Sequence, residues 1–301
     1  MLDRAGARRE DGDDDRMSMA ADIGTLPAPA AGKTGRAASR VLGRLGTLEV
    51  RLARSATEVR AAQELRYRVF FEEMSAKASR RQQASRRDSD SFDRFCDHLL
   101  VVETASGTDA IVGTYRLMLP EGAARAGGYY TAGEFRIEEL LKRHPDKRFL
   151  ELGRSCVLKE YRSKRTVELL WQGIWAYVLE HRVDVLFGCA SLEGDDPALL
   201  AAPLALLGSA APAPAEWRVG ALEGRAVPLP ANAVPADAKR ALGLLPPLLK
   251  GYLRIGGVIG PEAVVDRQFG TVDVLVVLPV DNINARYVTY YGSDAGRRFV
   301  A

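Results

Sequence analysis

The chain has 301 residues, of which 47% are hydrophobic and 27% are charged. This length and composition allow a well-buried core, so we expect a globular protein with one large or two modest domains. The sequence has no apolar run long enough to cross a bilayer and no signal-peptide core, which predicts a cytoplasmic protein. Peripheral contact with the inner membrane surface stays open.

The distribution of charge and the number of cysteines limit the kinds of partner and cofactor to expect. The net charge is only +3, but residues 77–87, KASRRQQASRR, carry five basic residues and no acidic one. Cys96, Cys156 and Cys189 are too far apart for a zinc motif and too few for a disulfide scaffold. We predict no metal site, no nucleic-acid partner and a reducing compartment.

The first half of the chain alternates between β and α patterns. Residues 1–46 are poor in large apolar groups, so we expect a disordered tail. Strand patterns follow at 48–54, 98–103, 111–119 and 148–157. A helix is expected after the capping signature of Ser55 and Glu58, running through 56–74, and a short one near 137–143.

The second half continues the mixed α/β order. An amphipathic helix is predicted at 166–182 and a buried strand at 183–191. Residues 197–215 fit either an ordinary packed helix or one that covers a ligand or touches lipid. The chain then ends in a helix at 246–257, a strand at 263–280 and a terminal helix at 282–292.

One predicted strand contains two charged residues. FLELGRSCV, residues 149–157, holds Glu151 and Arg154 among apolar neighbours, and burying an unpaired charge costs several kcal/mol. The two would point to opposite faces unless a bulge intervenes, and Gly153 suits a bulge. Structural salt bridges, such as Glu151 with Arg116 and Arg154 with an aspartate, remain an alternative to a reaction centre. Cys156 as a nucleophile is a weaker alternative.

Long blocks of the sequence resemble a known enzyme family. They include FLELGRSCVLKEYRSKRTVELLWQGIWAYV (149–178) and PPLLKGYLRIGGVIGPEAVVDRQFGTVDVLVVLPV (246–280). In these blocks the chain is similar to the L-ornithine Nα-acyltransferases. The resemblance implies one GNAT-like domain over 47–292, with a central mixed β-sheet splayed at the acyl-donor site, and a C-terminal tail at 293–301. It also implies transfer of a 3-hydroxyacyl chain from acyl carrier protein to L-ornithine, the first step of ornithine lipid synthesis, without a cofactor.

A sparser pattern is similar to the acyl-homoserine lactone synthases. On this chain it selects a set of charged and aromatic positions: Arg66, Phe70, Asp90, Asp93, Arg116, Glu151 and Arg154. Gly153 stands where those synthases usually have serine, which argues against that activity. Synthase-like acyl transfer and a non-catalytic carrier-binding or membrane-surface protein remain the alternatives.

The resemblance also suggests roles for individual residues. Glu151 would take the proton from the acceptor amine, while Arg116 and Arg154 would hold the substrate carboxylate or keep Glu151 ionised. The aspartates Asp90 and Asp93 would attract ammonium groups, and Arg66 and Phe70 would line the acyl passage. The backbone from Gly153 through Ser155 to Cys156 would stabilise the oxyanion.

The turn KEYRSKR precedes the helix where GNAT enzymes that use coenzyme A carry a glycine-rich phosphate loop. Here the turn has no glycine but several cations: Lys159, Arg162, Lys164 and Arg165. Long cationic side chains suit docking of an acidic carrier protein. A solvated basic loop is the alternative.

Overall fold

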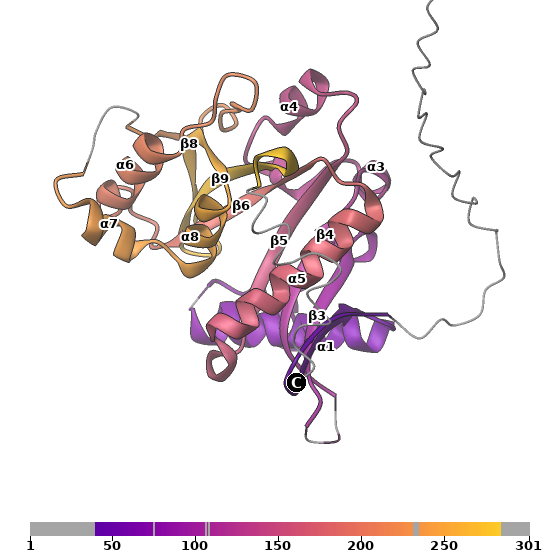
Figure 1. Cartoon of the computed structure of the whole chain (residues 1–301). Coiled ribbons are helices and arrows are strands. Elements are labelled where there is room, and N and C mark those ends of the chain that lie inside the picture. The colour runs from indigo at the N-terminus through magenta and orange to yellow at the C-terminus, as the bar shows by residue number, and fades with distance from the viewer. Residues whose placement is uncertain (1–39, 75, 106, 108, 231–234, 284–301) are drawn as a thin grey trace, which may run out of the picture. The chain divides into compact units, whose positions relative to one another are not determined.

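A computed structural model describes residues 40–74, 76–105, 107, 109–230 and 235–283 (Figure 1). Its strands are β1 (Val41–Leu45), β2 (Leu48–Leu52), β3 (Asp97–Glu103), β4 (Ala110–Met118), β5 (Phe149–Val157), β6 (Val185–Glu193), β7 (Ala226–Pro228), β8 (Val258–Asp266) and β9 (Thr271–Pro279). Its α-helices are α1 (Ala56–Tyr67), α2 (Arg80–Ser85), α3 (Pro120–Ala126), α4 (Ile137–Arg143), α5 (Lys164–His181), α6 (Ala201–Ala210), α7 (Ala238–Leu244) and α8 (Pro247–Arg254). Shorter helical turns are η1 (Arg68–Glu73), η2 (Asp93–Phe95), η3 (Tyr130–Gly133), η4 (Lys159–Tyr161) and η5 (Val280–Asn282).

The strands form one mixed sheet of nine strands in the order β1-β2-β3-β4-β5-β6-β9-β8-β7. Neighbouring strands pair antiparallel except β5 and β6, which are parallel and joined through α5. This confirms the predicted α/β class and the mixed central sheet.

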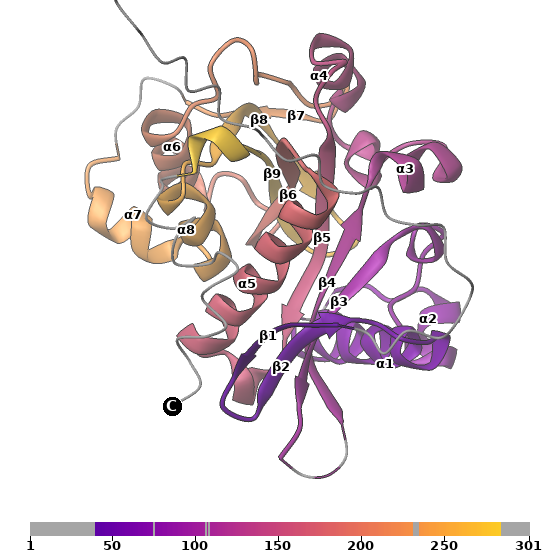
Figure 2. The ribbon, with the colours of Figure 1, turned by 45° about the vertical axis from the view of Figure 1, so that its right-hand side comes forward.

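Successive residues of a strand point to opposite faces of the sheet. On several strands both sets of side chains are apolar, so helices cover both faces. On β3, Leu99 and Val101 pack in the main core with α5, whereas Leu100 and Val102 pack with Ala62 of α1. Figure 2 shows α5 and α1 on opposite sides of these strands. The apolar residues of β3, α1 and α5 are therefore buried, as the periodicity of the sequence predicted.

The sheet divides between β5 and β6. Their pairing runs from Phe149 opposite Val185 to Glu151 opposite Phe187 and then stops, although both strands continue. At the division, a Cβ on Gly188 would lie 2.2 Å from the carbonyl oxygen of Leu152, so only glycine fits there. The predicted splayed sheet is confirmed, and its opening begins at Glu151.

Several predicted boundaries need correction. The tail does not extend to residue 46, because Val41–Leu45 forms β1 and pairs with β2. The strand expected at 263–280 is part of a hairpin of β8 and β9, since residues 267–270 make a turn. The expected terminal helix at 282–292 lies outside the described residues apart from its first two positions.

The segment 197–215 resolves to an ordinary packed helix. Leu204 and Leu207 of α6 belong to the main core. Among the described residues, no helix is long and apolar enough to cross a membrane.

Candidate active site

A cavity of about 790 Å³ opens where β5 and β6 separate. Part of its wall is polar and includes Glu151, Arg154 and Asp273. Another part is apolar and comes from η1, α5 and α8, with Phe70 and Trp171 among its residues. The cavity thus combines a place for charged groups with room for a hydrocarbon chain.

Glu151 is fixed at the point of division. Its side chain is 4% exposed, and its carboxylate accepts hydrogen bonds from the backbone N–H groups of Thr131 at 2.6 Å and Tyr130 at 3.1 Å. Burial raises the pKa of Glu151 above its ordinary value, although these hydrogen bonds and the positive charge of Arg116 oppose the rise. A buried carboxylate with a raised pKa that lines a cavity is suited to accept a proton.

A bulge brings Arg154 to the same cavity. Thr114 pairs with Cys156 and Arg116 pairs with Gly153, so β5 has one residue more than β4 over this interval. The predicted bulge is confirmed, but the left-handed backbone belongs to Arg154, with φ of 50°, and not to Gly153. Because of the extra residue, Glu151 and Arg154 both line the cavity.

The guanidinium of Arg154 is held between rings and carboxylates. It lies over the rings of Tyr130 at 4.6 Å and Phe269 at 4.7 Å. Its Nε is 3.2 Å from Asp88 and its terminal nitrogen is 3.5 Å from Asp90. This packing fixes the orientation of Arg154 without requiring a direct pair with Glu151.

Arg154 is one member of a closed ring of alternating ion pairs. Arg66 binds Asp88 and Asp93, each at 2.9 Å. Arg116 in turn binds Asp93 at 3.3 Å and Asp90 at 2.7 Å. Since Arg154 joins Asp90 to Asp88, the ring is complete and its formal charges cancel.

The ring changes the roles expected for three residues. Arg66, Asp90 and Asp93 are not among the residues that line the cavity, and their charged groups are bound within the ring. The guanidiniums of Arg66 and Arg116 hold the pKa of Asp93 well below its usual range even though burial raises it. Arg66 is therefore not part of an acyl passage, and the aspartates are neutralised before any ammonium arrives. Phe70 lines the cavity, and its contact with an acyl chain stays a prediction.

The alternative of structural salt bridges is half correct. Arg154 does pair with aspartates, but the carboxylate of Glu151 is bound by backbone amides and not by Arg116. Cys156 lines the cavity together with Gly153 and Ser155. Burial raises the pKa of the Cys156 thiol, which makes a thiolate nucleophile unfavourable.

The basic turn before α5 lies at the cavity. Ser163 caps α5, and Arg162 and Lys164 belong to the cavity lining. Arg162 is bound to Glu73 at 2.8 Å and to the Val157 carbonyl at 2.9 Å. Lys159, Lys164 and Arg165 of the turn are also exposed, and Lys164 pairs with Glu168 at 3.5 Å.

Sequence reasoning missed several residues around the site. Asp88 closes the ion-pair ring, and Tyr130 and Thr131 hold Glu151. Asp273 was also missed, although it stands in an apolar strand as Glu151 does. The amide donors could not be found from the sequence, because any residue type supplies a backbone N–H.

Comparisons with known proteins now decide the family. Residues 65–172 match the acetyltransferase (GNAT) domain family. The L-ornithine N(alpha)-acyltransferase of Rhizobium meliloti is 54% identical over 86% of this chain and 89% of its own. The chain belongs to the L-ornithine Nα-acyltransferase family. It is an N-acyltransferase, which excludes the expectation of a non-catalytic binding protein.

This chain is also similar to a second relative of the same name and, in part, to solved structures. The enzyme of the same name from Brucella abortus is 51% identical over 85% of this chain and 93% of its own. Among solved structures, FeeM, an N-acyl amino acid synthase from uncultured soil microbes, superposes with a TM-score of 0.40 at 12% identity, covering 78% of this chain and 91% of that one.

Proposed function

We propose that this N-acyltransferase moves a 3-hydroxyacyl group from acyl carrier protein to the α-nitrogen of L-ornithine, giving a lyso-ornithine lipid. The observation that carries the proposal is the position of Glu151, a buried carboxylate at the division of β5 and β6 in a chain of this family. The reaction needs no cofactor, because the thioester already activates the acyl group.

The nucleophile is the neutral α-amine of ornithine. An ammonium has no free electron pair, so Glu151 takes its proton, directly or through one water. The nitrogen then attacks the thioester carbonyl, the C–N bond forms and the C–S bond breaks. The nitrogen loses a second proton, which the sulfur takes up, so the carrier leaves as a thiol. Arg154 and Arg116 line this part of the cavity and would bind the α-carboxylate, although the aspartates of the ring balance their formal charge, and Arg116 also favours the ionised form of Glu151.

Backbone N–H groups of β5 would stabilise the negative charge that develops on the thioester oxygen. Beyond Glu151, β5 has no strand partner on its β6 side among the described residues, and the bulge at Arg154 interrupts its ladder with β4. Amides between Gly153 and Cys156 are our candidates for stabilising the tetrahedral oxyanion.

The donor side suits a long chain on a protein carrier. Apolar residues of η1, α5 and α8, including Val69, Trp171 and Leu249, would surround the hydrocarbon. The exposed cations Lys159, Lys164 and Arg165 lie at the glycine-free start of α5 and would attract an acidic carrier protein.

Expression in a host that lacks ornithine lipids tests this function. Mass spectrometry of the extracted lipids should reveal ornithine carrying one amide-linked 3-hydroxyacyl chain. The matched Glu151→Gln protein, expressed to the same level, should give at least about 100-fold less of this lipid. A host that accumulates no acylated ornithine despite soluble protein would contradict the proposal.

A further inference from the structure

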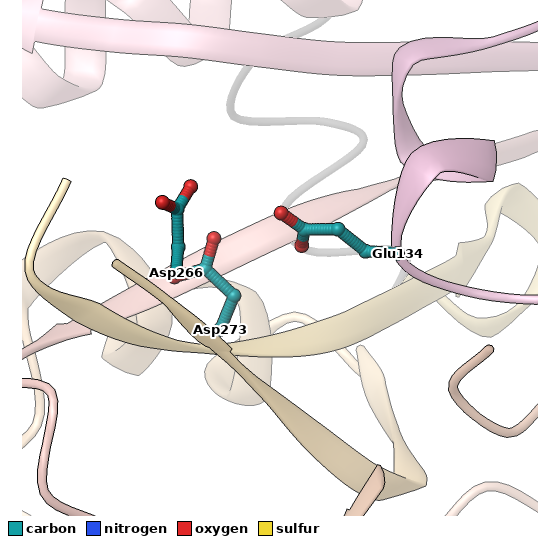
Figure 3. Close-up of side chains that lie close together, drawn as sticks. All are labelled: Glu134, Asp266 and Asp273. Atoms are coloured by element: carbon teal, nitrogen blue, oxygen red, sulfur yellow. The ribbon is translucent and has the colours of Figure 1, made fainter. Parts of the chain in front are cut away.

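Three carboxylates meet beside the candidate active site. Glu134 follows η3, Asp266 ends β8 and Asp273 lies in β9. One carboxylate oxygen from each lies within 4.8 Å of the other two, and Figure 3 shows the groups of Glu134 and Asp273 turned toward each other. Like charges this close repel one another strongly unless a cation or protons compensate them.

The cluster has an unused acceptor. Glu134 is 5% exposed, and its Oε2 has no hydrogen-bond partner among the described residues. The protein donors to the other two carboxylates are neutral: the Thr271 hydroxyl donates to Asp273 at 2.8 Å, and the backbone N–H of Gln268 donates to Asp266 at 2.7 Å. A buried carboxylate oxygen without a donor is costly, so this position calls for a ligand that donates hydrogen bonds.

Two of the three carboxylates share a cavity with Glu151, and Glu134 lies within 4.8 Å of these two. Asp266 and Asp273 line that cavity together with Glu151. Thr131 lies between them: its N–H donates to Glu151, and its hydroxyl accepts from the thiol of Cys189 at 3.7 Å. Cys189 in turn interacts with Glu134. The carboxylates therefore lie close to the group that we propose as the base.

We propose that Glu134, Asp266 and Asp273 hold the side-chain ammonium of the amino acid acceptor. This inference rests on the proposed function, which supplies an acceptor with a second nitrogen at the end of its side chain. An ammonium donates three hydrogen bonds along tetrahedral directions. Three acceptor oxygens at about 2.8 Å from the nitrogen would then lie about 4.6 Å from one another. The carboxylate oxygens of the cluster lie within 4.8 Å of one another, which is compatible with this spacing.

The cluster also explains the choice between two nitrogens. Carboxylates stabilise the protonated form of a nearby amine, so the side-chain nitrogen held there remains an ammonium and cannot attack the thioester. The α-nitrogen lies at the other end of the substrate, where Glu151 removes its proton. The acceptor pocket thus directs acylation to the α-position and discriminates against amino acids without a terminal amine.

The protonation behaviour of the empty cluster agrees with this role. Burial and the charge of Asp273 raise the pKa of Glu134 to about 7, and burial raises the pKa of Asp273 to about 6. Glu134 and Asp273 therefore keep protons to a higher pH than ordinary carboxylic acids do, and a bound cation would replace those protons.

The test compares L-ornithine with L-norvaline, which has the same carbon chain but no terminal amine. The wild-type protein should prefer ornithine in kcat/KM by about 10²- to 10³-fold, as expected when one partner of a buried charge pair is missing. Asp273→Asn and the less buried Asp266→Asn should each lower kcat/KM for ornithine, leave the slow norvaline reaction nearly unchanged, and increase acylation at the side-chain nitrogen. Asp195→Asn, which neutralises an exposed carboxylate outside the cavity lining, should keep the wild-type ratio.

Three outcomes would overturn the inference. If the ratio of kcat/KM for ornithine to kcat/KM for norvaline were unchanged in Asp273→Asn and Asp266→Asn, the cluster would not bind the terminal amine. Equal losses on both acceptors would indicate a purely structural role. Tight binding of Mn²⁺ or Ca²⁺ by the wild type, lost in Asp273→Asn and accompanied by inactivation with a chelator, would assign the cluster to a metal. Failure of the proposed function is distinct, because the wild type would then acylate neither acceptor.

Discussion

Thr131 donates its backbone N–H to Oε1 of Glu151 over 2.6 Å, from a segment that precedes β5 by a whole helix. This bond and the one from Tyr130 orient the carboxylate, while burial raises its pKa. The conjugate acid of Glu151 cannot accept a proton. Acyl transfer should therefore increase with pH through an acidic limb whose apparent pKa lies above the ordinary value of 4.5.

The measurement is kcat/KM for ornithine at saturating acyl carrier thioester across pH 5 to 9. A control with a weakly basic acceptor that is largely neutral above pH 5, such as O-methylhydroxylamine, should show a weaker limb because it needs no initial deprotonation. A rate that is flat across the titration of Glu151, or that falls as pH rises from 5, would be incompatible with its role as base.

Asp93 should prove to be structural. Its carboxylate binds both Arg66 and Arg116, and breaking a buried ion-pair network by removing one partner costs about 3–5 kcal/mol. Asp93→Asn should lower the free energy of unfolding in urea by about that amount at pH 7, whereas the exposed Asp195→Asn should change it by less than about 0.5 kcal/mol.

The sign of the pH dependence follows from the lowered pKa of Asp93. Its contribution is complete above the unfolded-state value of 3.8 and is lost as pH falls below it, so the difference between wild type and Asp93→Asn should narrow in acid. An increase in KM for ornithine with unchanged stability would instead support the original expectation that Asp93 binds an ammonium.

Glu134 should destabilise the ligand-free protein at alkaline pH. Its folded-state pKa of about 7 lies above the ordinary 4.5, so the folded protein binds more protons than the unfolded chain between these values. Stability should therefore decline as pH rises through this window. Glu134→Gln should be more stable than wild type at pH 8, with a smaller difference at pH 5, in thermal unfolding without substrate. Lower stability of the variant at pH 8 would argue against a strained carboxylate.

The sequence alone predicted the helices and strands whose side chains follow a regular apolar pattern. The helix α5 and the strands β3, β4 and β5 coincide with their apolar periodicity, because burial selects the same residues that the pattern displays. The strand β1 was missed since VLGRL is short and follows a long stretch of low hydrophobicity. Its pairing with β2 depends on a neighbour that local propensity does not reveal.

The candidate site was only partly predictable for a related reason. Glu151 was found because a carboxylate interrupts an apolar strand, and the same signal was present at Asp273. Glu134 and Asp266 lie outside such runs or at their ends and resemble ordinary surface acids in the sequence. The partners of Arg66 and Arg154 come from a loop distant in sequence, so the closed ring is a property of the tertiary structure.

Gly153 should tolerate a serine. A Cβ at this position would lie 4.0 Å from Nε of Arg116, and the left-handed backbone is at Arg154. Gly153→Ser should therefore change the free energy of unfolding by less than about 1 kcal/mol. Activity with ornithine should persist, and S-adenosylmethionine should remain inactive as an acceptor. A collapse of stability would show that the bulge requires glycine.

The cations at the start of α5 should govern carrier affinity. Lys164→Glu combined with Arg165→Glu should raise KM for the acyl carrier thioester about tenfold or more at low salt, since like charges oppose docking. The effect should shrink at high salt, and KM for ornithine should stay constant. The matched reversal of Lys239 and Arg240, exposed on α7, should leave both constants unchanged. If both charge reversals raised KM for the acyl carrier thioester equally, the turn before α5 would not be a specific docking site.

Single-turnover transfer by purified Glu151→Gln protein tests the central claim most directly. Wild-type and variant enzymes are mixed with 3-hydroxyacyl carrier protein and L-ornithine, and the amide product is quantified after rapid quenching. We expect the wild type to form the α-amide and the folded variant to be slower by about 10²- to 10⁴-fold, the usual contribution of a general base. A variant that retains wild-type rate would contradict the assignment of Glu151.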